Sequence, residues 1–248
     1  MYIKFSERAG EHYLLKDFLN SDPSSISVFQ NYGINYSCNG DKTLKDVCTE
    51  NGIDMNEVYL KLTEAGKKDS EEIEKFYKWD LRKLTDYLIE THETEIKQGA
   101  FSISKNLEKT STTFGSDFKE LKEIESTFTQ MLKEILNHIN NEEKFLFHVI
   151  RYLVDCKKFD EKPRISGFKT VKNPISKMES DHTKSDENLL RIKSLIKELE
   201  KNNEIPSEII SLIEEIKEFD KKFQFHLHIE NNILFPKAIE LEIELLKN

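Results

Sequence analysis

Apolar residues recur at steps of three and four over long stretches of this chain, with polar residues between them. Two such stripes stand out, one from residue 124 to 152 and one from residue 209 to 233. They consist of Ile124, Phe128, Met131, Ile135, His138, Glu142, Phe145, Val149 and Tyr152, and of Ile209, Leu212, Ile216, Phe219, Phe223, His226, Glu230 and Ile233. This repeat is typical of a helix that buries one face. The stripes therefore predict long helices packed in a bundle.

Two further stripes complete a set of four predicted helices. The first helix covers residues 71–107, and a turn at 110–116 leads to the second, which ends near residue 155. After a loop at 157–172, the third starts at Asn173-Pro174 and buries Ile175, Met178, His182, Ser185, Leu189, Ile192, Ile196 and Leu199. A turn at 202–206 begins the fourth helix, whose last residues, 240–246, are expected to form a solvated turn. We therefore predict a four-helix bundle at residues 71–248.

Residues 1–65 show a different pattern of short helical pieces. Pro23, Gly33 and the pair Asn51-Gly52 interrupt the apolar positions there, as turn residues do. The polar segment 66–70 is a predicted linker. Across all 248 residues, Gly (8) and Pro (5) are scarce, which favours helix. The expected fold class is all-α: a four-helix bundle with a small, cysteine-containing helical domain before it.

Each predicted helix of the bundle carries one histidine on its apolar stripe, and two of the helices add a glutamate four residues later. The histidines are His92, His138, His182 and His226, and the glutamates are Glu142 and Glu230. Residues four apart share a helix face. A lone histidine on such a face is usually a core residue, but a buried carboxylate needs a compensating cation or must be protonated. Two copies of the pair, both on core stripes, favour a metal site.

The donor set indicates the kind of metal. Four imidazoles and two carboxylates suit two ions bridged by the carboxylates, and the lack of thiolate disfavours structural zinc. Iron or manganese fits better. Six protein ligands cannot fill two octahedral shells, so oxo, hydroxo or water ligands must complete them, and positions remain for a small molecule.

Composition excludes several classes of partner. The net charge of −9 argues against nucleic acid or an anionic membrane. No apolar run approaches the roughly 20 residues of a membrane span, and the N-terminus has no apolar signal core. Three widely spaced cysteines suit a reducing compartment. We therefore expect a cytoplasmic protein.

Three segments carry a resemblance to a known family, and together they span nearly the full chain. They are residues Phe29 to Cys48, residues Asn173 to His182, and residues His226 to Pro236. The bundle motifs resemble those of the hemerythrin-like superfamily. The whole chain is similar to the ScdA-type di-iron proteins for repair of iron–sulfur centres. It departs from that family at Ser37, where a cysteine usually precedes the counterpart of Cys38.

The resemblance implies a set of roles. His92, His138, His182 and His226 would be terminal iron ligands, and Glu142 and Glu230 would bridge two iron ions per chain, with an oxo or hydroxo bridge between the ions. The function implied is restoration of iron–sulfur clusters damaged by nitric oxide or oxidants. Damaged iron–sulfur proteins, nitric oxide and oxygen would be the partners. Cys38, in a polar turn, is the candidate reactive thiol.

Two other functions stay open at this stage. One is a hemerythrin-like carrier or sensor of oxygen or nitric oxide without turnover, and the other is a di-iron oxidase or reductase. The cysteine-containing N-terminal domain favours repair, because a simple carrier does not need it. The electron donor and the oligomeric state, including a homodimer, are also left open.

Several other histidines, glutamates and cysteines lie outside the predicted donor set. His228 lies two residues after His226, so we expect it at the surface or behind the ligands and not among them. His148 is expected at the rim of the site. Glu134 is either a contact behind His138 or an ordinary solvated glutamate. Cys48 and Cys156 are expected to be packing residues.

Overall fold

The chain is all-α, as predicted. A computed structural model describes residues 12–247 except 23, 65–74, 165–168 and 203, and this part of the chain contains helices, turns and one isolated β-bridge between Leu14 and Thr43. It divides into two compact units. The first comprises residues up to Asp80 together with Leu227–Pro236, and the second comprises Leu81–His226 and Lys237–Asn248.

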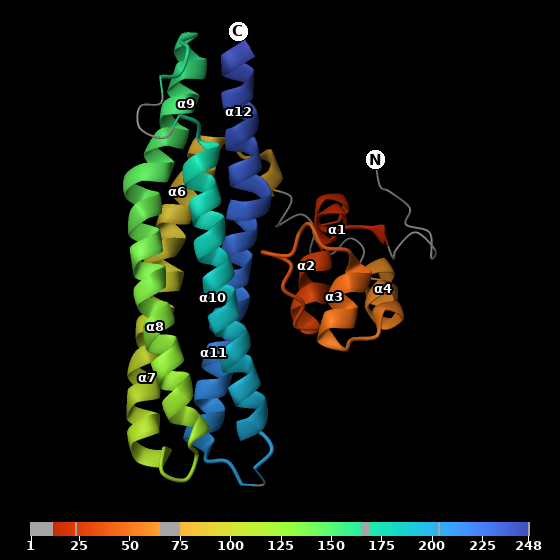
Figure 1. Cartoon of the computed structure of the whole chain (residues 1–248), viewed down its shortest axis with the longest axis vertical. Helices are drawn as coiled ribbons and strands as arrows, with labels where there is room; N and C mark the ends of the chain where they lie inside the picture. The colour runs from red at the N-terminus through yellow and green to blue at the C-terminus, as the bar shows by residue number, and fades with distance from the viewer. Residues whose placement is uncertain (1–11, 23, 65–74, 165–168, 203, 248) are drawn as a thin grey trace. The chain divides into compact units, whose positions relative to one another are not determined.

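Four long helical segments between Leu81 and Lys247 form a bundle (Figure 1). Three of them are interrupted by a π-helical turn, marked η. The segments are α6 (Leu81–Thr91), η2 (His92–Lys97) and α7 (Gln98–Phe114); α8 (Glu120–Asn141), η3 (Glu142–Leu146) and α9 (Phe147–Phe159); α10 (Lys172–Leu199); and α11 (Ser207–Ile229), η4 (Glu230–Leu234) and α12 (Phe235–Lys247). The predicted four-helix bundle is therefore present.

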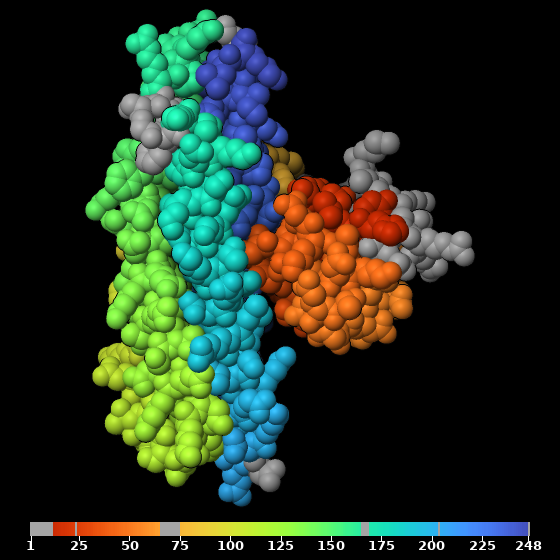
Figure 2. All heavy atoms as spheres, in the orientation of Figure 1, coloured from red at the N-terminus to blue at the C-terminus, as the bar shows by residue number. Residues whose placement is uncertain are grey.

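The apolar stripes form the core of this bundle. Every member of the stripe predicted for the third helix is buried in α10, and every member of the stripe at 209–233 is buried in α11 and η4. α8 and α10 lie side by side (Figure 1), and their side chains close the seam between the two ribbons (Figure 2).

The stripe at 124–152 is correct up to Glu142 and wrong beyond it. Phe145 is 52% exposed and Tyr152 is 39% exposed, whereas Leu146, Ile150 and Leu153 are at most 1% exposed. The cause is η3, which begins at Glu142. A π-helical turn holds more residues than an α-helical one, so every later position moves by one residue.

Three predicted helix boundaries also need correction. The first helix does not end before a turn at 110–116, because α7 continues to Phe114. Within it, the hydroxyl groups of Thr112 and Thr113 donate to carbonyls four residues earlier, which accommodates these poor helix formers. The second helix ends at Phe159 instead of near residue 155. Residues 240–246 are not a solvated turn, because α12 continues to Lys247 and buries Leu241, Glu242 and Leu245.

The first unit includes the short helices α1 (Leu15–Ser21), α2 (Ser25–Asn31), α3 (Leu44–Asn51) and α4 (Met55–Glu64). The side chain of Thr43 caps α3 by accepting from the N–H of Asp46. Gly33 and Gly52 follow α2 and α3 with φ of 66° and 65°, a conformation that glycine adopts without strain. The predicted linker at 66–70 lies outside the described residues, so the boundary between residues 1–65 and 71–248 stays a prediction.

Candidate metal centre

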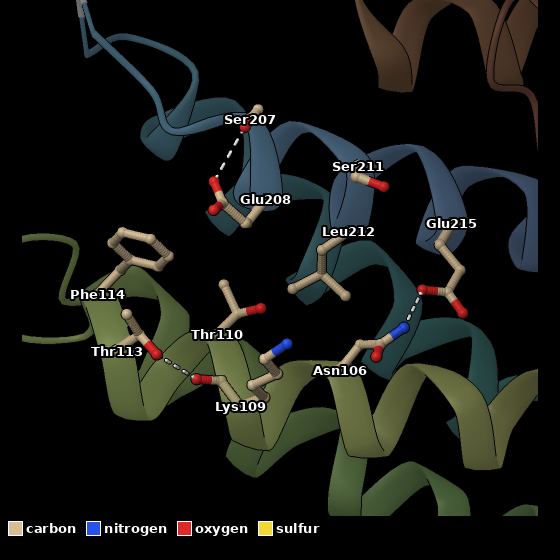
Figure 3. A pocket seen from close by; sticks show the side chains of 10 residues that line it. All are labelled: Asn106, Lys109, Thr110, Thr113, Phe114, Ser207, Glu208, Ser211, Leu212 and Glu215. Carbon is tan, nitrogen blue, oxygen red and sulfur yellow. Dashed lines mark hydrogen bonds between the residues drawn. The ribbon is translucent and has the colours of Figure 1, made fainter.

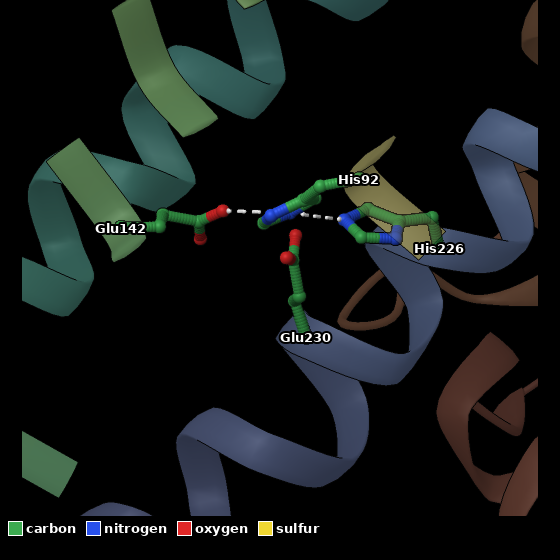
Figure 4. A group of neighbouring side chains, drawn as sticks. All are labelled: His92, Glu142, His226 and Glu230. Atoms are coloured by element: carbon green, nitrogen blue, oxygen red, sulfur yellow. Dashed lines mark hydrogen bonds and ion pairs between the residues drawn. The ribbon is translucent and has the colours of Figure 1, made fainter. Parts of the chain in front are cut away.

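The six side chains predicted to bind metal lie in one buried cluster. They form two groups of four, in each of which all donor atoms lie within 4.8 Å of one another. One group is His92, Glu142, His226 and Glu230, and the other is His138, Glu142, His182 and Glu230. Both carboxylates belong to both groups and have no exposed surface (0%). Figure 4 shows the first group pointing toward a common centre.

Local helix geometry places these residues. The three π-helical turns begin at His92, Glu142 and Glu230. Single π-turns within α-helices occur frequently at functional sites. His182 lies within α10, a regular helix. Three of the four segments therefore depart from α-helical geometry at a residue of the cluster.

The histidines meet in two pairs through their Nε2 atoms. Nε2 of His92 lies 3.1 Å from Nε2 of His226, and Nε2 of His182 lies 2.9 Å from Nε2 of His138. Glu142 lies between the pairs, because its Oε2 is 3.5 Å from Nε2 of His92 and 3.2 Å from Nε2 of His138. One carboxylate thus faces a nitrogen of each pair.

Neighbouring groups favour the same tautomer in both histidines of the first pair. Nδ1 of His92 lies 3.0 Å from Oε1 of Glu143, and a carboxylate oxygen only accepts, so Nδ1 carries the proton. Nδ1 of His226 lies 3.2 Å from the hydroxyl of Thr91, which already donates its hydrogen to the carbonyl of Leu88. With its hydrogen on Leu88, the hydroxyl accepts from Nδ1 of His226 when that nitrogen carries the proton. In neutral rings of this tautomer, both Nε2 atoms present lone pairs to each other.

This arrangement fits a metal ion well. Two nitrogen lone pairs 3.1 Å apart repel unless a proton or a cation lies between them. Two buried carboxylates in the same cluster also repel each other and are costly to desolvate. Nitrogen and oxygen donors without thiolate suit iron or manganese. The cluster is therefore a site that could hold metal cations, with His and Glu as the available donors.

Sequence reasoning missed two residues that contact the cluster from behind. Thr91 and Glu143 each hold the Nδ1 atom of a histidine. The doublet of Glu142 and Glu143 was a usable signal, since only one of two adjacent carboxylates can lie on a given helix face. The partner of Glu143, which is His92, can be identified only when the first and second helices are placed against each other.

The sequence predicts His228 either at the surface or behind the ligands, and the surface position is wrong. In the first unit His228 is fully buried, and its ring packs against those of Tyr36 and Tyr77. Asn232 contacts its Nδ1 at 3.1 Å. Burial lowers the pKa of His228 to about 3 and raises that of Tyr77. His228 therefore lies on a helix face that is covered by Tyr36, Tyr77 and Asn232, and not by the residues of the metal cluster.

Cys38 is half-buried in the same unit, where the side chain of Asn231 lies 4.0 Å from its sulfur and donates to the carbonyl of Ser37. Cys48 and Cys156 are buried, as predicted for packing residues. His148 is exposed. Glu134 accepts hydrogen bonds from Gln130 and Asn188.

A cleft between α7 and α11 lies elsewhere in the bundle (Figure 3). Its lining is mainly polar and includes Asn106, Lys109 and Glu215. Leu212, also in its wall, precedes His226 by 14 residues, about 21 Å along an α-helix. The cleft is therefore not part of the histidine and glutamate cluster.

Comparison with protein families agrees with this description. The model of the hemerythrin HHE cation binding domain matches residues 80–238, more than half of the chain. The chain belongs to the hemerythrin family. Binding of cations by hemerythrin domains agrees with the buried donors described above. A second model, for the ScdA N-terminal domain, matches residues 14–66 and is described only as a domain of unknown function.

Curated relatives match this hemerythrin-family chain over nearly all of its length. A protein of Haemophilus influenzae named "Probable iron-sulfur cluster repair protein" is 21% identical over 226 residues, covering 91% of this chain and 96% of the relative. The iron-sulfur cluster repair protein YtfE of Escherichia coli is 23% identical over 220 residues, covering 88% and 93%. Its Citrobacter koseri counterpart is 22% identical with the same coverage. The resemblance predicted from sequence is confirmed.

Proposed function

We propose that this chain is a di-iron protein that repairs iron–sulfur clusters damaged by nitrosative or oxidative stress. One observation carries the proposal: Glu142 and Glu230 are common to both groups of donors. A carboxylate that faces two groups can bridge two cations. His92 with His226 would supply the terminal nitrogens for one ion, and His138 with His182 those for the other.

Iron suits a donor set of imidazoles and carboxylates and can carry out redox chemistry. Six side chains leave positions open on two octahedral ions, and the donors are nitrogen and oxygen. When bound, two iron ions would supply one-electron redox chemistry and open positions for nitric oxide or oxygen. The protein's contribution is a buried cluster in which Nδ1 of His92 faces Glu143 and Nδ1 of His226 faces Thr91, which leaves Nε2 of each ring for a metal.

The repair function is supported by the names of the relatives, which match this chain over nearly all of its length. The damaged iron–sulfur proteins would then be its partners. The three cysteines all lie among the described residues and form no disulfide, which suits a reducing cytoplasm. Among the described residues, no helix has the length and apolar character needed to cross a membrane.

A carrier or sensor of oxygen or nitric oxide is the second candidate. The same cluster could serve it, since open metal positions suit binding as well as turnover. The N-terminal domain match at residues 14–66 favours repair, because a carrier needs only the bundle.

One experiment separates these functions. The purified protein is loaded with Fe(II) under anaerobic conditions, its iron content is measured, and it is incubated with an iron–sulfur dehydratase inactivated by nitric oxide. We expect two iron ions per chain and recovery of dehydratase activity beyond that given by the same amount of free Fe(II). The metal-free protein should give no recovery.

Two results would overturn the proposal. Saturation at one metal ion, or zinc with no uptake of iron, would contradict the di-iron centre. Two bound iron ions with a reversible absorption change on adding oxygen, but without dehydratase recovery, would support the carrier instead.

A further inference from the structure

We propose that Glu143 is a positioning residue of the metal centre, which holds the ring of His92 so that Nε2 is its metal-binding atom. The proposal rests on the proposed function, because it assumes that His92 binds iron. Glu143 is not among the proposed ligands, and it would act on a bound metal only through its contact with His92.

The contact is direct and lies at a boundary between buried and exposed atoms. Oε1 of Glu143 is 3.0 Å from Nδ1 of His92 and 3.6 Å from Nζ of Lys97. The side chain of His92 is 0% exposed and that of Glu143 is 27% exposed. The carboxylate therefore reaches from the edge of the bundle to the back of a buried ring.

This contact selects one tautomer of His92. The carboxylate repels a lone pair on Nδ1 and accepts a hydrogen bond from a protonated Nδ1. Protonation of Nδ1 leaves the lone pair on Nε2, the atom that faces His226. A carboxylate in this position also makes the imidazole a stronger donor. Glu143 thus prepares His92 to bind a cation.

Glu143 and Phe147 together fix the orientation of the ring. The ring of Phe147 stacks on that of His92, with centroids 5.9 Å apart and planes 7° apart. The stacking sets the plane of the imidazole, and the hydrogen bond to Glu143 sets its rotation within that plane. Neither nitrogen can then turn away from its partner without breaking one of these contacts.

The doublet of Glu142 and Glu143 divides two tasks between adjacent residues. Successive residues of a helix point in different directions around its axis. Glu142 faces the donor cluster, while Glu143 reaches the π-turn η2, where His92 is the first residue and Lys97 the last. One carboxylate would contact metal, and the next would contact the back of a ligand.

Glu93 provides a matched control. Its carboxylate also pairs with Lys97, and its side chain is 62% exposed. Glu93→Gln removes one carboxylate charge next to Lys97, as Glu143→Gln does, but Glu93 pairs with Lys97 on the exposed side of η2. A comparison of the two variants separates the contact with His92 from the general loss of a negative charge.

The test uses the full chain with Fe(II) and a competing chelator under anaerobic conditions, followed by measurement of the reduction potential. Glu143→Gln keeps the shape and loses the charge, and Glu143→Asp keeps the charge and shortens the reach. We expect either variant to bind Fe(II) about 10- to 100-fold more weakly than the parent. Glu143→Gln should also raise the reduction potential, because a negative charge behind a ligand stabilises ferric iron. Glu93→Gln should bind as the parent does.

The outcomes distinguish this proposal from the proposed function. A parent that fails to bind two Fe(II) ions overturns both. A parent that binds two, with both Glu143 variants equal to it in affinity and potential, overturns this proposal alone. Equal weakening in Glu93→Gln would show a general charge effect and overturn it as well. So would a loss of folding in both Glu143 variants without metal, since Glu143 would then belong to the fold.

Discussion

The buried carboxylate of Glu242 in α12 accepts a hydrogen bond from the backbone N–H of Val171, 2.9 Å from its Oε1, at the start of α10. Its other oxygen accepts from the hydroxyl of Thr170. The first N–H groups of a helix have no partner within the helix and carry partial positive charge. Glu242 therefore caps the helix that carries His182.

Replacement of Glu242 by Gln should destabilise the bundle. The variant loses the charge that complements the start of α10, and its amide cannot accept through both terminal atoms. We expect a loss of about 1–2 kcal/mol in the free energy of unfolding. For a chain of this size, that lowers the melting temperature by about 2–8 °C. Thermal unfolding by circular dichroism measures it. Glu240→Gln, at an exposed position, is the control, and equal melting of the two variants would contradict the capping role.

The register shift at η3 predicts losses of stability of very different size for two neighbouring residues. Phe145 is 52% exposed and Leu146 is 1% exposed. Leu146→Ala should cost about 2–5 kcal/mol, since it leaves a cavity in the core. Phe145→Ala should cost much less, because its side chain is largely in solvent. Urea unfolding of both metal-free variants measures the difference. A larger loss for Phe145→Ala would mean that the uninterrupted α-helical stripe is correct.

The sequence was sufficient for the bundle because the stripes are long and regular. Ile175 to Leu199 keeps one period over a whole helix, and α10 has no π-turn to disturb it. Sequence periodicity assumes a constant number of residues per turn. It therefore fails after Glu142, where one wide turn moves the buried face from Phe145 to Leu146.

The histidines and glutamates of the buried cluster could also be predicted, because such a residue on an apolar stripe is itself a signal. The residues that contact these side chains from behind could not be predicted. Glu143 and Thr91 look like ordinary polar positions until the first two helices are placed against each other. Glu242 was misread for the same reason, since its partner Val171 is 71 residues away. Contacts between helices decide these roles, and periodicity within one helix does not contain them.

The cysteines should differ sharply in reactivity. Burial, with a smaller contribution from Asp54, raises the pKa of Cys48 to about 11. Since the thiolate is the reactive form, alkylation of Cys48 should be slow near neutral pH and rise about tenfold per pH unit up to pH 11. Cys38 is half-buried and should react first. Iodoacetamide labelling followed by peptide mass spectrometry at several pH values measures both rates.

Cys38→Ser is the matched variant for this measurement. It should remove the fast-reacting thiol and leave the iron content unchanged, because Cys38 is not among the donors of the cluster. Labelling of Cys48 at the rate of Cys38 would contradict the shielding of Cys48. Loss of iron from Cys38→Ser would mean that the donor set is incomplete.

Replacement of Glu230 by leucine tests whether this carboxylate binds metal or stabilises the fold. Glu230 is 0% exposed, and its carboxylate belongs to the same groups as that of Glu142. Without metal, the two buried carboxylates repel each other and must be desolvated or protonated, at a cost on the order of a few kcal/mol. Leucine has a similar size and would relieve that cost. We expect Glu230→Leu to bind much less iron, yet to melt at a higher temperature than the metal-free parent.

Metal-free samples are essential for this comparison, because bound iron would stabilise the parent by mass action. Glu142→Leu should behave in the same way, since its carboxylate is shared by the same two groups. Glu218→Leu, at an exposed position of α11, controls for the general effect of replacing glutamate by leucine. A lower melting temperature for metal-free Glu230→Leu would show that the carboxylate stabilises the fold through the neighbouring histidines. Unchanged iron content would remove Glu230 from the ligands and leave Glu142 as the remaining shared carboxylate for a bridged pair of ions.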